Sequence, residues 1–228
     1  LGHVELAADL AGRLEQIDLA ADRQEVVLFL HDFAFKNPTE VLAEITGGMA
    51  GGHAGHGTAM TGGDTAKGHD MTGMAGMDPM DGMAMDLNDY DWDAYLANDR
   101  TLSDPEVVMV ERGGRVRLRV INAAAATVFW IDTGALDGRL VAVDGHGVRP
   151  VGGSRFGIAM GQRLDIELDL PGAGAWSIFA LREGALDRTG IVLSSSGAAI
   201  SRIDGQGEAA APAFDRDLRQ EAGLVAME

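Results

Sequence analysis

The chain contains no cysteine among its 228 residues. This absence excludes disulfides, thiolate nucleophiles, iron–sulfur ligation and every cysteine-based zinc site. No apolar run approaches the ~20 residues that a membrane-spanning helix needs, so the sequence predicts no membrane span. Basic residues are scarce: 18 Lys and Arg stand against 35 Asp and Glu, which gives a net charge of −17. Such an acidic surface repels phosphate and anionic lipid, so neither nucleic acid nor a membrane is expected as a partner.

Residues 88–203 have the pattern of a β protein. Polar and apolar side chains alternate in Arg115–Ile121 and Arg163–Leu170, as in strands with one buried face. Turn signals such as Asp144-Gly145 separate short apolar runs at intervals of about 8–12 residues. The runs are Val107–Val110, Thr127–Ile131, Arg139–Val143, Ala175–Leu181 and Gly190–Leu193. This spacing predicts an all-β sandwich or barrel, and no helical pattern of βαβ type lies between the runs.

The two flanks differ from this central region. In residues 1–46 we expect a buried strand at Val26–Phe33 and a short helix at Pro38–Ile45, with proline in its first turn. One strand and one helix cannot form a core, so we interpret residues 1–46 as the tail of a preceding domain and a linker. Residues 204–228 lose the strand pattern, and we interpret them as a linker toward a following domain.

Residues 47–87 have an unusual composition. They hold twelve glycines, eight methionines and three histidines, and apart from Leu87 they contain no Val, Ile, Leu, Phe, Tyr or Trp. Without apolar side chains to bury, nothing offsets the chain entropy that folding removes. We therefore expect a disordered Met/Gly/His-rich insertion in the absence of a ligand.

Six short sequence segments within residues 23–200 are informative together: Val27–Phe33, Tyr95–Leu102, Val110–Asn122, Leu140–Gly145, Val148–Val151 and Met160–Ile166. In this order and spacing they resemble the middle cupredoxin domain of a three-domain multicopper oxidase of the laccase-like or copper-resistance type. The resemblance implies a cupredoxin-like Greek-key β-sandwich for residues 88–203. It also implies a copper-dependent parent oxidase exported to the periplasm.

The ligand motifs of that family are missing. Its members use a cysteine-bearing type 1 copper and His-x-His pairs in the first and last domains, and the chain has neither cysteine nor His-x-His. A blue-copper site needs a thiolate and imidazoles, so this chain cannot build one. The middle domain of the family commonly carries no copper of its own. We therefore predict a scaffold fragment that is inactive alone, whose partners are copper ions and the first and third cupredoxin domains.

The chemistry that the chain itself could perform lies in the Met/Gly/His-rich insertion. Thioether sulfur is a soft ligand that suits Cu(I), and imidazole suits copper too. Glycine would let the backbone wrap such side chains around one ion. The metal-binding candidates are His53, His56, His69, Met71, Met74, Met77, Met80, Met83 and Met85. The opposing interpretation is compositional drift in a tolerant linker.

Three function classes therefore stay open: a component of a multicopper oxidase, a copper-sequestering protein without redox turnover, and an interaction domain with an inert linker. Outside the insertion, His31 is expected to be structural, and His146 to be exposed in a hairpin turn. The alternating arginines of 115–119 and acids of 165–169 predict paired solvent faces rather than acid–base catalysis.

Overall fold

The computed structural model describes residues 23–52, 90–214 and 219–227. These residues form eleven strands and two helices. In chain order the elements are β1 (Gln24–Phe33), α2 (Pro38–Gly52), β2 (Ala94–Ala97), β3 (Val107–Met109), β4 (Arg115–Asn122), β5 (Phe129–Asp132), β6 (Gly138–Val143), β7 (His146–Gly153), β8 (Arg155–Ile158), β9 (Arg163–Asp169), β10 (Ala175–Arg182), β11 (Arg188–Ser194) and α3 (Arg219–Ala222). No helix among the described residues is long and apolar enough to cross a bilayer.

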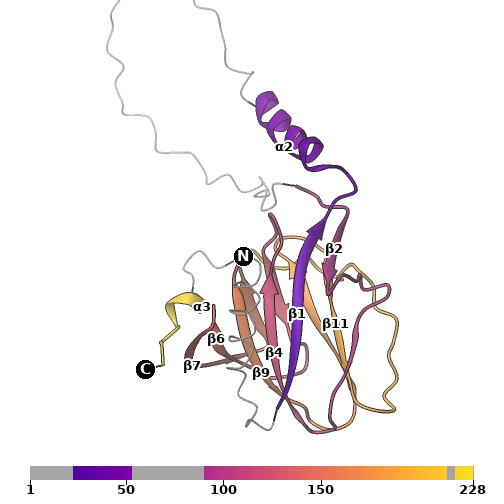
Figure 1. The fold of residues 1–228 in the computed structure, drawn as a ribbon, viewed down its shortest axis with the longest axis vertical. Coiled ribbons are helices and arrows are strands. Elements are labelled where there is room, and N and C mark those ends of the chain that lie inside the picture. Colours follow the sequence, from indigo (N-terminus) through magenta and orange to yellow (C-terminus); the bar gives the residue numbers. More distant parts are fainter. Residues whose placement is uncertain (1–22, 53–89, 215–218, 228) are drawn as a thin grey trace, which may run out of the picture.

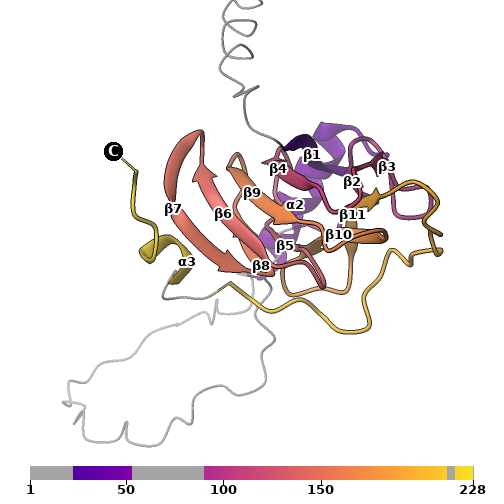
Figure 2. The same ribbon diagram turned by 90° about the horizontal axis from the view of Figure 1, so that it is seen from below.

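The strands form two packed sheets, which confirms the predicted all-β sandwich. Sheet A has the order β2-β1-β4-β9-β6-β7, and sheet B has the order β3-β11-β10-β5-β8. Both sheets are mixed, because β1 runs parallel to β4 and β3 runs parallel to β11. The two layers are seen end-on in Figure 2. Helix α2 stands away from the sandwich beyond the end of β1 (Figure 1).

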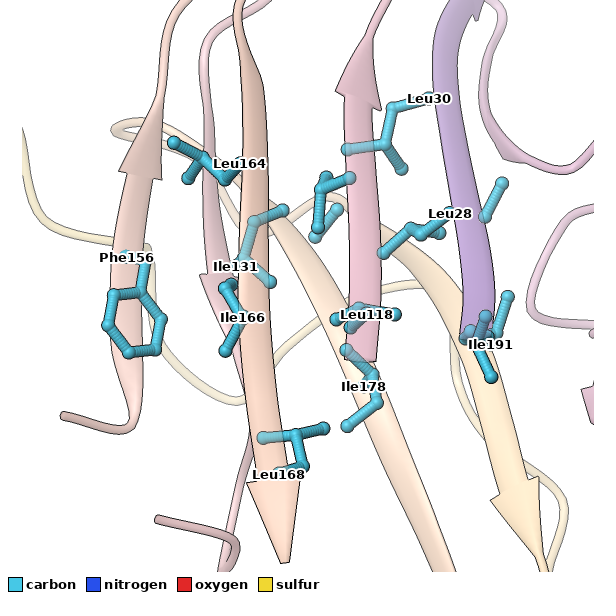
Figure 3. Close-up of a cluster of buried hydrophobic side chains, with 14 of the residues drawn as sticks. Leu28, Leu30, Leu118, Ile131, Phe156, Leu164, Ile166, Leu168, Ile178 and Ile191 are labelled. Carbon is cyan, nitrogen blue, oxygen red and sulfur yellow. The ribbon is translucent and has the colours of Figure 1, made fainter. Parts of the chain in front are cut away.

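The core lies between the sheets and follows from the period of two along each strand. In β4 the burial alternates, with Val116, Leu118 and Val120 inside and the arginines between them outside. Figure 3 shows part of this core, with side chains from both sheets pointing toward one another. The largest fully buried side chains are Phe129, Leu28, Leu30, Leu118, Ile131, Leu140, Ile158, Leu164, Ile166, Leu168, Ile178 and Ile191. Burial of these side chains is the main force that holds the two sheets together.

The predicted strand runs appear as β3, β4, β5, β6, β9, β10 and β11, each within a few residues of its expected bounds. The hairpin predicted at Asp144-Gly145 joins β6 to β7. Asp144 has φ 49° and Gly145 φ 81°, so both central residues have the positive φ that a type I′ turn requires. Strands β2, β7 and β8 were not predicted.

The strand in residues 1–46 lies inside the sandwich rather than in a preceding domain. Strand β1 pairs with β4 over seven residues and with β2 over four. Its inner residues Val26, Leu28 and Leu30 belong to the common core. The expectation that residues 1–46 lie outside the β domain therefore does not hold for β1. The reason is that its pairing partners come from more than sixty residues later in the chain, a relation that local sequence does not encode.

Helix α2 begins where expected but is longer than predicted. Asn37 caps it: its Oδ1 accepts from the N–H groups of Thr39 and Glu40 at 3.0 and 3.1 Å. The Glu40 carboxylate in turn accepts from the Asn37 N–H at 3.0 Å, which completes a capping box. The helix continues to Gly52, so the first six residues of segment 47–87 are helical, contrary to the expected disorder. The residues after Gly52 and up to 89 lie outside the described part of the chain.

The C-terminal residues were expected to be a linker, yet the described ones are bonded to the sandwich. Residues 204–211 pair with the β10–β11 connection through backbone hydrogen bonds. The Arg188 N–H donates to the Gly205 carbonyl at 2.9 Å, and the Gly207 N–H donates to the Leu186 carbonyl at 2.7 Å. Residues 225–227 then lie along β7, and the Arg149 N–H donates to the Val225 carbonyl at 2.8 Å. We call residues 204–214 and 219–227 the C-terminal strap; α3 within it lies beside the β7 end of the sandwich (Figure 2).

Candidate functional site

The predicted copper ligands lie outside the part of the chain that the structure describes. This holds for all of them: His53, His56, His69, Met71, Met74, Met77, Met80, Met83 and Met85. Copper binding by these residues therefore stays a prediction. The described residues offer a different candidate site, which is the outer face of sheet A, away from the core.

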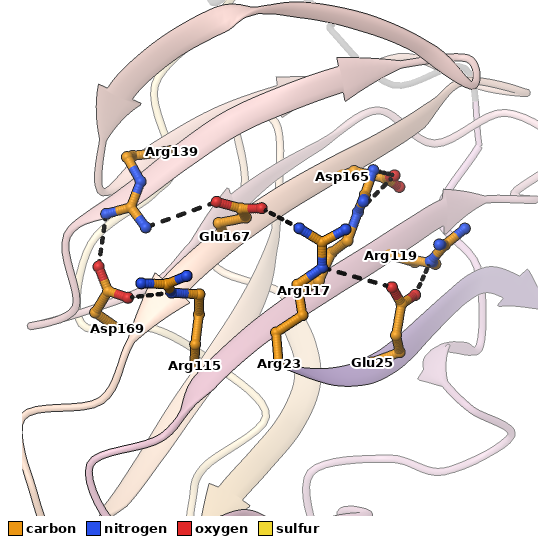
Figure 4. A network of polar contacts seen from close by, with 9 residues as sticks. All are labelled: Arg23, Glu25, Arg115, Arg117, Arg119, Arg139, Asp165, Glu167 and Asp169. Atoms are coloured by element: carbon orange, nitrogen blue, oxygen red, sulfur yellow. Dashed lines mark hydrogen bonds and ion pairs between the residues drawn. The ribbon is translucent and has the colours of Figure 1, made fainter. Parts of the chain in front are cut away.

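One part of this face carries a network of ion pairs, which we call the charged ladder (Figure 4). Strands β4 and β9 pair so that Arg115 lies opposite Asp169 and Arg119 opposite Asp165. This register confirms the predicted pairing of their solvent faces. The members of the ladder are Arg23, Glu25, Arg115, Arg117, Arg119, Arg139, Asp165, Glu167 and Asp169.

The ladder is nearly continuous. The Asp169 carboxylate pairs with Arg115 at 3.1 Å and with Arg139 at 2.7 Å. The Glu167 carboxylate pairs with Arg139 at 3.7 Å and with Arg23 at 2.8 Å. Glu25 then links Arg23, at 3.9 Å, to Arg119. The Arg139 guanidinium, together with that of Arg115, holds the pKa of the Asp169 carboxyl below its usual value. A carboxylate that is ionised and paired in this way has no proton to give at neutral pH, so the ladder is suited to structure rather than to acid–base chemistry.

The other part of the same face is apolar. We call it the aromatic patch, and its members are Val27, Phe29, His31, Phe33, Leu96 and Ile121. The first four are the outward residues of β1, and the pairings of His31 with Leu96 and of Phe29 with Ile121 bring β2 and β4 into it. Val27 is 50% exposed, Phe29 38% and Phe33 39%. The charged ladder adjoins the patch through the pairing of Val27 with Arg119.

Sequence reasoning missed this patch. The short, β-branched and aromatic run Val26–Phe33 predicts a buried strand, without a distinction between its two faces. In the structure only one face of β1 is buried, since Val26, Leu28 and Leu30 point into the core and the residues between them point outward. The signal that could have found it is the two polar residues in the outward series, Glu25 and His31, which a wholly buried strand would not carry.

Strand β2 is held against β1 by a tight turn that follows it. Asn98 and Asp99 have positive φ values of 50° and 62°, a conformation that Asn and Asp adopt more readily than other non-glycine residues. The Asn98 side chain replaces a strand neighbour: its Oδ1 accepts from the Phe29 N–H at 2.7 Å and its Nδ2 donates to the Val27 carbonyl at 2.9 Å. The turn places the exposed Asp99 carboxylate 3.6 Å from His31 Nε2, at the border of the aromatic patch.

A buried cation lies at the far side of β2. The Arg182 side chain is 5% exposed; it pairs with Asp91 at 2.6 Å and Asp187 at 3.2 Å, and its guanidinium lies 5.2 Å from the centre of the Tyr95 ring. Burial raises the pKa of Tyr95 to about 12, although the Arg182 charge acts in the opposite direction. Arg182 is paired with both carboxylates and its guanidinium lies over the Tyr95 ring, while the buried Tyr95 hydroxyl has no hydrogen-bond partner among the described residues. The cluster thus connects β10 with β2.

Comparison with known proteins shows the family to which this β-sandwich belongs. The family model described as multicopper oxidase matches residues 25–202, which is most of the chain. The chain belongs to the multicopper oxidase family. The copper resistance protein A of Escherichia coli is 34% identical over 114 residues, which is 50% of this chain and 18% of that protein. The protein of the same name from Pseudomonas syringae pv. tomato is 34% identical over 96 residues, 42% of this chain and 15% of that protein.

Solved structures show the same fold. The multicopper oxidase Fet3p, described as functioning in iron import, matches with a TM-score of 0.57 at 9% identity, over 83% of this chain and 31% of that one. The laccase from Botrytis aclada matches with a TM-score of 0.52 at 16% identity, over 81% of this chain and 31% of that one. This multicopper oxidase chain therefore spans less than a fifth of its curated relatives and about a third of these structures.

The described residues do not fit a type 1 copper. The sequence supplies no thiolate. The two described histidines, His31 and His146, lie on β1 and β7, with β4, β9 and β6 between them in sheet A. Within the described ranges, no group of three or more His, Asp or Glu is placed to hold a metal ion. His146 is exposed at the hairpin, as predicted, and His31 is half-buried beside Phe29.

Proposed function

We propose that this chain is the copper-free β-sandwich domain of a larger multicopper oxidase, an enzyme that couples substrate oxidation to reduction of dioxygen. Its role there is to hold the copper-bearing first and third cupredoxin domains at the spacing that their shared copper cluster needs. One observation carries the proposal: the family match covers residues 25–202, yet the sequence has no cysteine for a blue-copper site.

The architecture supports a scaffold role. A spacer between two redox domains has to keep its shape, and a closed core with an ion-paired outer face resists deformation. The charged ladder ties together β1, β4, β9 and β6, four of the six strands of sheet A, through side chains that alternate in sign. Each exposed pair contributes little alone, but a connected network restrains several strands at once.

We further propose that the Met/Gly/His-rich insertion captures Cu(I) weakly and that the protein acts in the periplasm. The composition of the insertion supports the first part, since soft thioether ligands select Cu(I). The similarity to copper resistance proteins supports both parts. The alternative is a copper-sequestering protein, in which the same insertion works without electron transfer.

A Cu(I) titration tests the insertion. In the test variant the six methionines from Met71 to Met85 are changed to leucine, which keeps the apolar volume and removes the sulfur. The control variant changes Met109, Met160 and Met227 instead. Uptake measured against a competing Cu(I) chelator should be lost in the test variant and kept in the control. Equal uptake by the test variant and the unmodified chain would refute the Cu(I) proposal.

An oxidase assay tests the scaffold. With added copper, the isolated chain should show neither an intense blue colour nor oxidation of phenols or diamines, because it lacks the thiolate. The full-length polypeptide that contains this segment should show both. If that polypeptide binds copper without consuming oxygen, the sequestering alternative is correct and the oxidase proposal is wrong.

A further inference from the structure

A groove opens between the two sheets at one end of the sandwich, between β1 and β3. Strand β2 pairs only with Leu30–Phe33 at the end of β1, so the first half of β1 has no strand beside it on that side among the described residues. Strand β3 is an edge strand of sheet B. Strands β1, β2 and β3 lie together at the end of the sandwich opposite β7 (Figure 2). The groove has a volume of about 750 Å³, and both strands contribute to its lining.

The β1 rim of the groove carries backbone groups without partners. The Asn98 side chain bonds to the Phe29 N–H and the Val27 carbonyl, at 2.7 and 2.9 Å, which shows that these groups point toward the groove. Backbone groups of alternate strand residues point to the same side, so the Val27 N–H and the N–H and carbonyl of Glu25 point there as well. None of these three groups has a hydrogen-bond partner among the described residues. This half of β1 is therefore an open sheet edge.

The β3 rim is open in the same way. The Glu106 carbonyl and the Val110 N–H bond to β11, so the backbone groups of Val107 and Met109 point away from β11 and toward the groove. The Val107 N–H and carbonyl and the Met109 N–H have no partner in the part of the chain that the structure describes. The groove thus has an unpaired strand edge along each side.

Only side chains cross the groove between these two edges. Gln24 Nε2 donates to the Met109 carbonyl at 2.7 Å, and Asn98 Nδ2 donates to the Glu106 carboxylate as well as to Val27. These contacts place Gln24 against Met109 and bring Val27 toward Glu106, so β1 and β3 run antiparallel across the groove. No backbone hydrogen bond joins the two strands within the described ranges. A strand inserted between them, with about 4.8 Å to each neighbour, would replace both bridges and join sheets A and B.

The lining of the groove specifies the side chains of such a strand. Val26 and Val108 line it with apolar side chains that also pack in the core. Glu106 has no basic partner among the described residues, whereas Asp104 is already paired with Arg100 at 2.7 Å. A strand with apolar side chains on one face and basic side chains on the other satisfies both features.

We infer that the groove binds an extended basic peptide by strand addition. Main-chain hydrogen bonds to β1 and β3 give the affinity, and alternate side chains meet the valines and Glu106. The residues before β1 are disfavoured as the occupant, because residues 14–22 carry three acids and no basic side chain. A second copy of the chain is disfavoured too, since two molecules of net charge −17 repel each other. The inference goes beyond the scaffold role and needs neither copper nor another cupredoxin domain.

A synthetic peptide tests the inference. The probe is acetyl-Thr-Lys-Val-Lys-Val-Lys-Thr-amide, which alternates lysine with β-branched residues. Its control has proline in place of the first valine, which keeps the charge but removes a backbone donor that strand pairing needs. Amide hydrogen exchange of the 228-residue chain is measured with and without a large excess of each peptide. We expect the probe to slow exchange of the Glu25, Val27 and Val107 amides at least tenfold, and the proline peptide to leave it unchanged.

A pair of protein variants tests the charge preference. Glu106→Gln removes the carboxylate charge and keeps an acceptor for Asn98. The control is Glu111→Gln, which changes an exposed acid that does not line the groove. Calorimetry should show at least fivefold weaker binding of the probe by the first variant and unchanged binding by the second.

Equal protection by the two peptides would mean that cations merely adsorb to an acidic surface, and it would overturn the inference. Absence of protection by the probe would overturn it as well. Protection of the Val27 and Val107 amides that grows with protein concentration, without any peptide, would place a second copy of the chain in the groove instead.

Discussion

At the residue scale, the buried Tyr95 makes the free energy of unfolding depend on pH at alkaline values. The Tyr95 hydroxyl is buried, and burial raises its pKa to about 12, above the value of about 10 for an unfolded chain. Below pH 10 the tyrosine is neutral in both states and its burial carries no ionisation cost. Above pH 10 the unfolded chain loses the proton first, so the free energy of unfolding falls between pH 10 and 12.

Replacing Tyr95 with Phe should therefore reduce the loss of stability at high pH. We expect the difference in unfolding free energy between pH 7 and pH 11.5 to shrink by on the order of 1–2 kcal/mol. Urea unfolding at the two pH values measures it. Tyr90→Phe is the comparison: Tyr90 is less buried, and burial and the Glu44 charge raise its pKa too, so we expect a smaller change in the same direction. An unchanged pH dependence in Tyr95→Phe would show that the hydroxyl ionises freely in the folded state.

Gly190 in β11 is required by a close backbone contact. It has φ +155°, and a Cβ atom at this position would lie 2.1 Å from the Ile178 carbonyl oxygen of the paired strand β10. Changing Gly190 to Ala should destabilise the domain by roughly 3 kcal/mol or more, since neither backbone can move without breaking the pairing. Gly152→Ala in β7 is the control, because nothing lies within 4 Å of its Cβ position. Similar urea midpoints for the two variants would contradict this account.

At the scale of elements, the C-terminal strap covers one edge strand of each sheet, β8 and β7. The Gln220 side chain in α3 accepts from the Gly157 N–H and donates to the Gly157 carbonyl, both at 2.8 Å. It thereby takes the place of a missing neighbour of β8, the edge strand of sheet B. Residues 225–227 cover β7, the edge of sheet A, in the same way. Unprotected edges pair with other chains, so the strap has a role in preventing aggregation.

Gln220→Ala should uncover the Gly157 backbone without disturbing the core. We expect a loss of about 1 kcal/mol in unfolding free energy and faster hydrogen exchange of the Gly157 amide. Heating with light-scattering detection should also show earlier aggregation. Glu221→Ala, at the neighbouring exposed position of the same helix, is the control. Unchanged exchange at Gly157 would mean that the amide is protected by something other than Gln220.

These elements show which parts of the fold the sequence encodes locally. The long strands β4 and β9 alternate cleanly, so their bounds and their charged outer faces were predicted. Strands β2 (AYLA) and β8 (RFGI) lack the run of consecutive β-branched or aromatic residues that marks the equally short β3 and β5. Strand β7 is an edge strand with the sequence HGVRPVGG and only one fully buried residue. It therefore lacks the apolar run by which the other strands are predicted. Its pairing, and that of the strap, depends on contacts that form only after the sheets assemble.

At the scale of the whole molecule, the position of the Met/Gly/His-rich insertion becomes clear. Phe33 at the end of β1 is paired with Ala94 at the start of β2. The sixty residues between them, 34–93, therefore leave and re-enter sheet A at neighbouring points. The sequence predicted an insertion and its chemistry, but the long segment concealed that β1 and β2 form one antiparallel pair. The long segment also concealed that β2 and β4 flank β1 and contribute Leu96 and Ile121 to the aromatic patch.

Deleting residues 53–89 should therefore leave the sandwich intact. The deletion shortens the connection between two paired strand ends, and loop-closure entropy predicts a gain of roughly 1 kcal/mol or less. We expect an unchanged or slightly higher urea midpoint, retained near-ultraviolet circular dichroism, and loss of Cu(I) uptake. The matched deletion is residues 53–69, which removes the three histidines and keeps Met71–Met85. Partial uptake by this second variant would assign the remaining affinity to the methionines. Unfolding of the first variant would instead show that residues 53–89 contribute to the core, and the domain and its insertion would then not be independent.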